Sequence, residues 1–311
     1  MKQAFVFPGQ GSQAVGMGKA LAGAFPAARD VFGEVDEALK QSLARLMFEG
    51  PEDQLTLTEN AQPALMAVSM AVMRVLAVDG HFDLGRSAAF VAGHSLGEYS
   101  ALAAAEALSL ADVARLLKVR GSAMQEATPV GIGAMAAILA LDFEAVASIA
   151  EEAAAGEVCA AANDNAPGQI VVSGHRAAVE RAIALATERG ARRAVMLQVS
   201  APFHCILMEP AAKRMAEALA ETTLHAPVVP LVSNVKAEAV SDPAEIRDLL
   251  VKQVTGTVRW RESVQWMKRQ GVERLVEAGA GKVLAGLAKR IDGDLAAVSL
   301  NTPADIEAFL K

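Results

Sequence analysis

The sequence predicts an α/β fold with a parallel, doubly wound sheet and one inserted ferredoxin-like βαββαβ unit. Three observations lead to this prediction. Short apolar segments alternate with helical ones along most of the chain, which is typical of a parallel sheet. A strand, a glycine-flanked turn and a helix follow one another within residues 88–107. Between residues 129 and 199 the order changes, and two strands come in succession.

The composition indicates a folded globular chain and excludes several other classes. Of the 311 residues, 53% are hydrophobic and 21% are charged, which is enough for a large core. The net charge of −7, without any block of Lys or Arg, argues against nucleic-acid binding. We expect no apolar run that reaches the length of a membrane span, and Pro8 breaks the N-terminal segment too early for a signal peptide. Two cysteines provide neither a disulfide framework nor metal-ligand spacing, so we expect a reducing, cytoplasmic location.

The chain begins with a buried strand and a glycine-rich turn. We expect the strand at 4–8, the turn at 9–13 and a helix near 19–25. The turn fails the G-x-G-x-x-G spacing and lacks a Walker Lys-Ser/Thr, which disfavours nucleotide binding; its backbone N–H groups are candidates to face an anion. Residues 28–58 are predicted to be helical with breaks. A helix over 60–78 is apolar nearly all round, so we expect it to be buried.

Residues 88–107 predict a nucleophile elbow, which makes the large part of the fold α/β-hydrolase-like. An apolar strand leads into Gly93-His94-Ser95-Leu96-Gly97 and then into a run of strong helix formers. Gly93 and Gly97 lack Cβ atoms, so the strand and the helix can approach closely around a strained serine. The helix N-terminus favours the negative oxygen that develops during acyl transfer. We therefore predict that Ser95 is an acylated nucleophile.

The remaining elements divide the chain in two. A helix starts at Ser109, which we expect to cap it, and ends before Pro129. The inserted unit is predicted to have strands at 133–140, 157–162, 169–172 and 194–199, helices at 143–154 and 176–188, and a turn at 163–168. The outer part resumes with helices at 210–222, 243–254, 260–270, 283–291 and 303–310 and strands at 228–232, 272–276 and 296–300. We expect a large subdomain of residues 1–128 and 200–311 and a small ferredoxin-like subdomain of residues 129–199.

A serine nucleophile needs a base, and histidine is the usual one because its pKa lies near neutral. Of the five histidines, we expect His81 and His225 at the surface and His175 at a helix start. His94 is held inside the elbow and is expected to point away from its neighbour. His204 follows the return of the chain from the inserted unit, at a junction where clefts form, so it is the favoured base.

No residue marks the acid of a catalytic triad. Asp142 is expected to be a helix cap and Asp164 a turn residue. A dyad therefore remains possible, in which a backbone carbonyl or an amide side chain orients the imidazole.

Several motifs in the same order resemble one family, the malonyl-CoA:acyl carrier protein transacylases of bacterial fatty-acid synthesis, over nearly the whole chain. They are Phe7-Pro8-Gly9-Gln10-Gly11-Ser12-Gln13, Gly93-His94-Ser95-Leu96-Gly97-Glu98-Tyr99, Arg120-Gly121, residues 165–174, Pro202-Phe203-His204, Ser233-Asn234-Val235, Gln253 with Val258-Arg259-Trp260, and residues 279–284. The sequence departs from the family where Cys205 replaces a frequent serine, where Ala280 stands in a Gly-Pro-Gly turn and where Asp164 replaces a frequent aromatic residue.

The resemblance implies a role for each matching residue. Ser95 would carry the malonyl ester, and His204 would act first as base and then as acid. The backbone N–H groups of Gln10 and Leu96 would form the oxyanion hole. Arg120 would pair with the malonyl carboxylate, because a guanidinium binds a carboxylate bidentately.

The resemblance also implies how this site is completed. Gln253 would orient the imidazole through its backbone carbonyl. This carbonyl would take the place of the acid of a catalytic triad, for which the sequence shows no candidate. Gln13 and Asn165 would line the site, and Met124 and Phe203 would wall the acyl pocket. No metal and no redox cofactor would be needed. The partners would be malonyl-CoA and acyl carrier protein, with neither nucleic acid nor a membrane, and the chain would act as a monomer.

The implied function is a ping-pong transfer of the malonyl group from malonyl-CoA to the phosphopantetheine thiol of acyl carrier protein, for fatty-acid elongation. Three alternatives remain open from the sequence. The chain could be a serine esterase or lipase, or a non-catalytic acyl-binding module. It could also be an acyltransferase of a polyketide or malonate-decarboxylase system, because these enzymes share the motifs.

Overall fold

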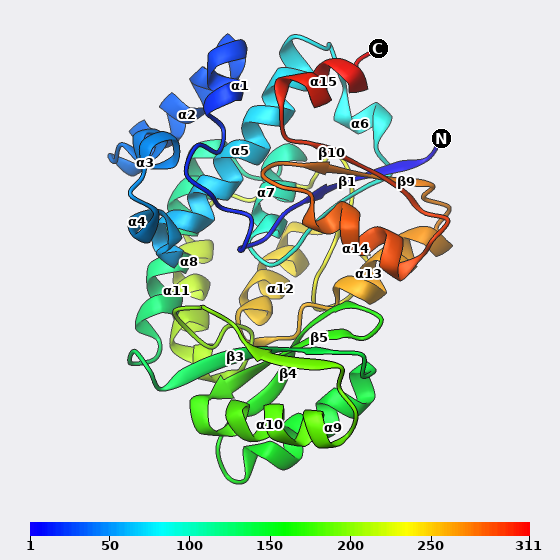
Figure 1. Cartoon of the computed structure of the whole chain (residues 1–311). Helices are drawn as coiled ribbons and strands as arrows, with labels where there is room; N and C mark the ends of the chain where they lie inside the picture. Colours follow the sequence, from blue (N-terminus) through cyan, green and yellow to red (C-terminus); the bar gives the residue numbers. More distant parts are fainter.

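The molecule contains two sheets, a large one that is mainly parallel and a small antiparallel one (Figure 1). The computed structural model describes all 311 residues. The large sheet has the order β10–β9–β1–β2–β7–β8; all neighbours are parallel except β8, which pairs antiparallel with β7. Its strands are β1 (Gln3–Phe7), β2 (Phe90–Gly93), β7 (Leu231–Val232), β8 (Ala239–Val240), β9 (Arg274–Ala278) and β10 (Ala296–Leu300).

Helices cover both faces of this sheet, as the predicted doubly wound fold requires. Strand β1 shows it most directly, because successive side chains of a strand point to opposite faces. Phe5 and Phe7 belong to the largest hydrophobic cluster, with α5, α7 and α8, whereas Ala4 and Val6 belong to a second cluster with α13 and α14. The helices around the large sheet are α1 (Lys19–Ala24), α2 (Pro26–Leu39), α3 (Leu43–Glu49), α4 (Glu52–Thr56), α5 (Thr58–Val78), α6 (Leu84–Ser87), α7 (Gly97–Ala104), α8 (Leu110–Glu126), the 3₁₀ turn η1 (Ile206–Met208), α11 (Glu209–Ala220), α12 (Pro243–Thr255), α13 (Trp260–Arg269), α14 (Val283–Ile291) and α15 (Pro303–Phe309).

Helix α5 corrects one expectation from the sequence. It is long and apolar enough to cross a membrane by length and composition alone, although we expected no such run. In the structure, 83% of its most apolar window is buried, and it packs against α2, α7 and α8. The helix is therefore part of the protein core, as its apolar residues on all sides predicted.

The small sheet is the predicted ferredoxin-like unit. Its elements follow one another as β3 (Gly133–Leu139), α9 (Phe143–Ala154), β4 (Cys159–Ala166), β5 (Gln169–His175), α10 (Arg176–Glu188) and β6 (Arg193–Met196). The strand order is β4–β5–β3–β6, with every neighbouring pair antiparallel. Both helices lie on the outer face of this sheet, away from the chain termini, and the opposite face looks toward the large sheet (Figure 1).

The predicted turn at 163–168 is wrong except for its last two residues. Strand β4 continues through Ala166, and the hairpin turn is Pro167-Gly168 alone. Two register shifts along β4 accommodate the polar residues of this stretch in the strand. Asp164 is therefore a buried strand residue and not a turn residue. Its carboxylate is paired with Arg261 of α13, which compensates its charge.

Other boundaries differ by a few residues. Helix α7 ends at Ala104 and not at 107, and β9 lies two residues later than predicted. Strand β7 has only two residues, while α6 and β8 were not predicted. The predicted caps are confirmed, since the side chains of Ser109 and Asp142 accept hydrogen bonds from the first turns of α8 and α9.

Candidate active site

The site forms where two neighbouring parallel strands end. Strands β1 and β2 are paired in register, so the turns that follow them lie at the same edge of the sheet. The two turns are in close contact: a Cβ on Gly9 would come within 2.8 Å of the His94 carbonyl oxygen, and one on Gly97 would overlap the carbonyl of Phe7. Glycine is needed at both positions for this approach.

The elbow holds Ser95 in a strained conformation. Its φ of 53° lies in the left-handed region that residues other than glycine seldom adopt. Asn234, which follows β7, supports this geometry: its Oδ1 accepts a hydrogen bond from the Ser95 N–H at 2.7 Å, and its Nδ2 donates to the Gly93 carbonyl at 2.7 Å. The serine side chain is thereby presented at the end of the sheet.

His204 meets this serine from a chain segment more than a hundred residues away. The Oγ of Ser95 and the Nε2 of His204 are 2.8 Å apart. The Nδ1 of His204 lies 2.9 Å from the backbone carbonyl of Gln253. A carbonyl can only accept, so Nδ1 carries the proton and Nε2 is free to accept one from the serine. The arrangement is a dyad oriented by a backbone carbonyl.

The environment keeps this imidazole neutral. His204 is only 4% exposed, and burial lowers its pKa to about 3, with the nearby charge of Arg120 as the second cause. The backbone of Gln253 opposes the shift by accepting a hydrogen bond from the ring. A neutral imidazole is the form that acts as a general base.

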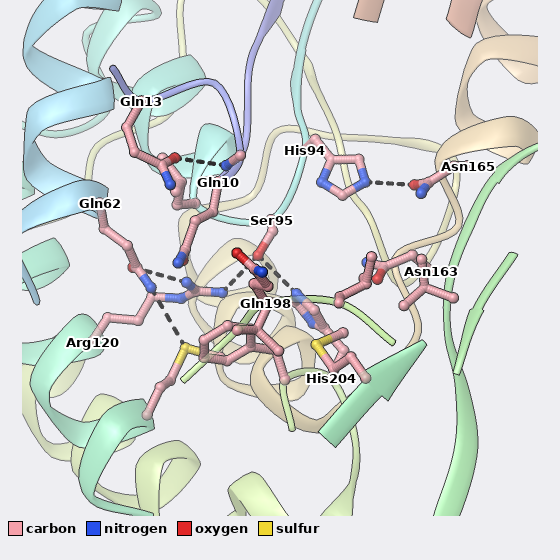
Figure 2. A pocket seen from close by; sticks show the side chains of 18 residues that line it. Gln10, Gln13, Gln62, His94, Ser95, Arg120, Asn163, Asn165, Gln198 and His204 are labelled. Atoms are coloured by element: carbon pink, nitrogen blue, oxygen red, sulfur yellow. Dashed lines mark hydrogen bonds between the residues drawn. The ribbon is translucent and has the colours of Figure 1, made fainter. Parts of the chain in front are cut away.

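Arg120 places a guanidinium on the other side of Ser95. The residue is 1% exposed and reaches the site from α8. Its Nη2 donates to Ser95 Oγ at 3.1 Å and to Gln253 Oε1 at 2.8 Å, and its Nη1 donates to Gln62 Oε1 at 2.9 Å. Its Nε is buried and has no hydrogen-bond partner in the protein. Figure 2 shows Arg120 and His204 bonded to Ser95 from different directions.

These groups line one cavity of about 360 Å³ between the large sheet and the small one. The lining residues that matter for its chemistry are Gln10, Gln13, Gln62, His94, Ser95, Leu96, Arg120, Met124, Asn163, Asn165, Phe203 and His204. Nine of the ten site residues predicted from the sequence therefore line this one cavity (Figure 2). Gln253 is the exception, because it is completely buried behind the site.

Two backbone N–H groups of the cavity wall are available for an anion. Neither the N–H of Gln10 nor that of Leu96 donates a hydrogen bond to another atom of the protein. Both residues line the cavity, one in each of the two turns that meet at the sheet edge. A pair of unpaired donors beside a nucleophile is the arrangement that stabilises an oxyanion.

Hydrogen bonds also hold His94, Asn165 and Gln13 in the cavity wall. His94 points away from Ser95, and its Nε2 lies 2.8 Å from the Asn165 Oδ1 (Figure 2). Burial lowers the pKa of His94, so this ring is neutral. The Oε1 of Gln13 accepts a hydrogen bond from the Gly11 N–H at 2.7 Å, which ties down the first turn. No group of three or more His, Cys, Asp and Glu side chains has the arrangement of a metal site.

The sequence analysis assigned no role to three residues that hold the site together, which are Asn234, Glu98 and Gln62. Glu98 is buried beneath the elbow, where its Oε1 accepts from the Asn234 N–H at 2.7 Å and its Oε2 accepts from the Gln253 Nε2. Gln62 binds Arg120 from the start of α5. Gln62 follows Glu59 and Asn60 in the polar first turns of α5, so no local signal in the sequence singles it out.

Comparison with known proteins identifies close relatives. The acyl transferase domain family matches residues 4–289. The malonyl CoA-acyl carrier protein transacylase of Escherichia coli (strain K12) is 48% identical over 308 residues, which cover 99% of this chain and 98% of that protein. The protein of the same name from Bacillus subtilis (strain 168) is 46% identical over 311 residues, covering 100% and 96% of the two chains.

Solved structures of similar proteins superimpose on this structure over nearly the full length of both chains. The crystal structure of an acyl-carrier-protein-S-malonyltransferase from Bartonella henselae superimposes with a TM-score of 0.97 at 56% identity, covering 100% of this chain and 98% of that one. A malonyl-transacylase solved in complex with its type II PKS acyl-carrier protein has a TM-score of 0.96 at 42% identity, covering 100% and 99%.

Proposed function

Because this chain belongs to the acyl transferase family, we propose that Ser95, His204 and Arg120 carry out its reaction. That reaction is the transfer of the malonyl group from malonyl-CoA to the phosphopantetheine thiol of acyl carrier protein, which supplies fatty-acid synthesis. The observation that carries the proposal is the position of Ser95 Oγ, 2.8 Å from the His204 Nε2 and 3.1 Å from the Arg120 Nη2. One hydroxyl is thus next to both a base and a carboxylate-binding group.

In the first half-reaction the Ser95 Oγ attacks the thioester carbonyl of malonyl-CoA while His204 Nε2 takes its proton. The carbonyl oxygen becomes negative and binds the N–H groups of Gln10 and Leu96. When the tetrahedral intermediate collapses, the C–S bond breaks and the imidazolium returns the proton to the departing thiolate of CoA. The products are free CoA and a malonyl ester on Ser95.

The second half-reaction reverses these roles with a different thiol. The thiol of the carrier's phosphopantetheine arm gives its proton to the neutral His204 and attacks the ester carbonyl. The same N–H groups stabilise the oxyanion. Collapse breaks the bond to Ser95 Oγ, and His204 protonates that oxygen. The serine and the imidazole return to their starting states, so no metal or redox group is consumed or required.

Arg120 links recognition of the acyl group to the strength of the base. After burial, its positive charge is the largest cause that lowers the pKa of His204. A malonyl carboxylate bound to the guanidinium would neutralise much of that charge, and its bidentate pairing would use the unpartnered Nε. The pKa of His204 then rises toward its ordinary value. The imidazole becomes a better base when the correct acyl group is present.

We propose that residues 129–199 act as a separate subdomain that covers the acyl group on a large subdomain of residues 1–128 and 200–311. The cavity supports this, because Met135, Asn165 and Val171 of the small sheet line it together with the elbow. A transferase must keep water away from its ester, and a cavity walled on two sides serves that need. Met124 and Phe203 contribute the apolar part of the wall.

The chain is proposed to act as a cytoplasmic monomer. Every group used in the mechanism comes from a single chain, so no partner copy is needed to complete the site. Both cysteines are free and buried, which suits a reducing compartment. Malonyl-CoA and acyl carrier protein are the only partners that the mechanism requires.

Intact-protein mass spectrometry after brief exposure to a panel of acyl-CoAs tests nucleophile and selectivity together. We expect one malonyl adduct on the wild-type protein and none on Ser95→Ala. Ser100→Ala is the matched control, because Ser100 is a buried serine of α7, the helix that follows the elbow, and its hydroxyl has no hydrogen-bond partner. It should keep the adduct.

A malonyl adduct that persists on Ser95→Ala would overturn the mechanism. Turnover of malonyl-CoA without any acceptor thiol, at the rate seen with carrier protein, would instead indicate the serine hydrolase that the sequence left open. Absence of any adduct from the wild-type protein would favour the non-catalytic acyl-binding module.

A further inference from the structure

Glu98 is a buried carboxylate next to the site, and the transfer steps above make no use of it. The residue is 1% exposed and lies in the first turn of α7, directly after the elbow. Burying a carboxylate without an ion pair is costly. Its two oxygens nevertheless accept from the Asn234 N–H and the Gln253 Nε2, which are both uncharged donors. Such a group calls for a functional explanation.

The first consequence of this carboxylate is the orientation of the Gln253 amide. The Nε2 of Gln253 donates both to Glu98 and to the Ser95 carbonyl, at 2.9 Å in the latter case. Its Oε1 is therefore left to accept from Arg120 at 2.8 Å. An amide that turned over would present a donor to the guanidinium, which is itself only a donor. Glu98 thus decides which end of Gln253 faces Arg120.

The second consequence concerns charge. Arg120 has no carboxylate in contact with it. Burial lowers its pKa, and the nearby acidic groups Tyr99 and Glu98 oppose this effect. Because burial raises the pKa of Tyr99 to about 12, Glu98 is the one of the two that ionises near neutral pH. With Glu98 ionised, the two buried charges cancel. A malonyl carboxylate on Arg120 would bring a second negative charge into the same enclosed region, where charges are poorly screened. Protonation of Glu98 restores neutrality.

We propose that Glu98 is a positioning residue that fixes the Gln253 amide against Arg120 and takes up a proton when the malonyl carboxylate binds. This inference rests on the proposed role of Arg120. Glu98 does not touch the reacting atoms; it acts through Gln253, whose backbone carbonyl also orients His204. Recognition of the carboxylate is then coupled to the protonation state of a residue behind the site.

Glu98 is the group of this region that titrates near neutral pH. Burial raises its pKa to about 7, against the opposing effects of Asn234, Gln253, Arg120 and Ser233. The other titratable groups that face the region do not change charge there: burial raises the pKa of Tyr99 to about 12 and lowers that of His204 to about 3 and that of His94 below its usual value. Arg120 stays protonated, because the ordinary pKa of arginine is so high.

The structure also provides an acceptor for the added proton. A protonated carboxyl group must donate a hydrogen bond when it is buried. The Ser233 hydroxyl is buried beside Glu98 and has no other hydrogen-bond partner. It can accept from the protonated Glu98 while the Asn234 and Gln253 donors keep their acceptor oxygens.

The sign of the pH effect follows from this coupling. Malonyl binding favours protonated Glu98, so the affinity for malonyl-CoA is highest at low pH and falls as pH rises above about 7. The affinity for malonyl-CoA decreases by about tenfold per pH unit over the range in which Glu98 is ionised in the free protein and protonated in the complex. Acetyl-CoA carries no carboxylate in the acyl group, so its affinity lacks this dependence.

Isothermal titration calorimetry in buffers of different ionisation enthalpy measures the proton directly. Malonyl-CoA and acetyl-CoA are titrated into Ser95→Ala, which prevents acylation, and the difference between them removes the contribution of the CoA phosphates. We expect the binding of malonyl-CoA to be accompanied by the uptake of about half a proton more than the binding of acetyl-CoA at pH 7. At pH 5.5 the difference should be almost zero, because Glu98 is already protonated in the free protein. The excess should vanish in Ser95→Ala with Glu98→Gln.

Glu277→Gln is the matched control, because Glu277 is also completely buried with a raised pKa. It lies on β9, and its carboxylate accepts from the Leu284 and Ala285 N–H groups in the first turn of α14. In the Ser95→Ala background it should leave the uptake unchanged. Wild-type kinetics give a second readout that needs no variant: the ratio of the KM for malonyl-CoA to that for acetyl-CoA should rise above pH 7.

The outcomes separate this inference from the proposed function. Malonyl-CoA that binds no more tightly than acetyl-CoA, with Arg120→Ala having no effect, would refute the role of Arg120. Tighter binding that depends on Arg120 but brings no extra proton, or brings one that survives Glu98→Gln, would overturn the inference about Glu98 alone. A flat KM ratio between pH 6 and 8 would overturn it as well.

Discussion

Arg120 is buried in a way that suits a ligand with a carboxylate. Its guanidinium is 1% exposed, contacts no carboxylate, and has one nitrogen, Nε, without any hydrogen-bond partner. Buried donors are almost always satisfied in folded proteins, and buried charges are paired. The neighbouring ring of Tyr99, 5.8 Å from the guanidinium carbon, gives only a weak substitute for an anion. The free protein is therefore complementary to an acyl group that carries its own carboxylate.

Removing this guanidinium should change acyl selectivity more than overall activity. We expect Arg120→Ala to lower kcat/KM for malonyl transfer by about 10²–10³-fold, because two charge-assisted hydrogen bonds are lost. Acetyl transfer should fall much less, since the acetyl group offers no carboxylate. Arg120→Lys should recover little, because an ammonium cannot make the bidentate contact. Steady-state kinetics with both acyl-CoAs measure the ratio.

Arg115→Ala provides the control for that experiment. Arg115 is on the same helix but is exposed and pairs with Asp112 one turn away. Its loss should leave both activities unchanged. Equal losses of malonyl and acetyl transfer in Arg120→Ala would mean that the arginine supports the structure of the site and does not recognise a carboxylate.

At the level of single residues, local chemistry predicts Ser95 and His204 but not the rest. A serine between two glycines and a histidine at a chain junction can be recognised by their own patterns. Arg120 is one arginine of a helix, and its role came only from a resemblance to a family. Asn234 and Gln253 contact the elbow across 139 and 158 residues of sequence. No local pattern encodes contacts of that separation.

At the level of elements, the elbow depends on how closely β2 and α7 approach. A Cβ on Gly93 would overlap the backbone carbonyl of Gly97, four residues on. The strained φ of Ser95 is kept because the strand, the helix and the Asn234 bridge hold the turn from three sides. The position of the nucleophile is thus set by backbone packing.

Gly93→Ala should disrupt this packing. The backbone of the turn must shift to make room, which we expect to lower the free energy of unfolding by about 2–4 kcal/mol. The remaining folded protein should transfer malonyl groups at least tenfold more slowly, because displaced reacting atoms lose their alignment. Urea unfolding and steady-state kinetics measure the two effects.

Gly33→Ala is the matched substitution for Gly93→Ala. Gly33 is an exposed residue of α2, and an added Cβ there meets nothing within 4 Å. Stability should be unchanged or rise by up to about 1 kcal/mol, because alanine favours the helix. If Gly93→Ala proved as harmless as Gly33→Ala, close strand–helix approach would not be what positions Ser95.

The elements differ in how well the sequence predicts them. Long helices with a clear apolar side, such as α12 and α13, lie within two residues of their predicted bounds. Strands β7 and β8 have only two residues each; β7 exists through pairing with the distant β2, and β8 pairs only with β7. Residues 163–166 have a turn-like composition but form a strand because β5 and Arg261 satisfy their polar groups. Where tertiary contacts determine the secondary structure, the local propensity of the residues does not predict it.

At the scale of the whole molecule, the cavity exists because the small sheet is fixed onto the large part of the fold. The attachment runs along the edge of β4. The Asp164 N–H donates to the Val258 carbonyl at 2.9 Å, and the Val258 N–H donates to the Ala162 carbonyl at 2.9 Å. Beside these bonds, Asp164 accepts two hydrogen bonds from the Nε of Arg261, at 3.0 and 2.9 Å. This edge therefore joins the two walls of the site.

Weakening this attachment should let water reach the acyl-enzyme. In Asp164→Asn the charge that pairs with Arg261 is lost; because Arg261 is 25% exposed and can turn to solvent, we expect a loss of only about 1–3 kcal/mol of stability. Hydrogen exchange should increase at 159–166 and 257–261, and the malonyl ester on Ser95 should hydrolyse faster without an acceptor. Glu152→Gln is the control, because its exposed pair with Arg189 lies wholly within the small unit and should affect neither measurement. Faster exchange with an unchanged ester lifetime would mean that closure of the two sheets is not what excludes water.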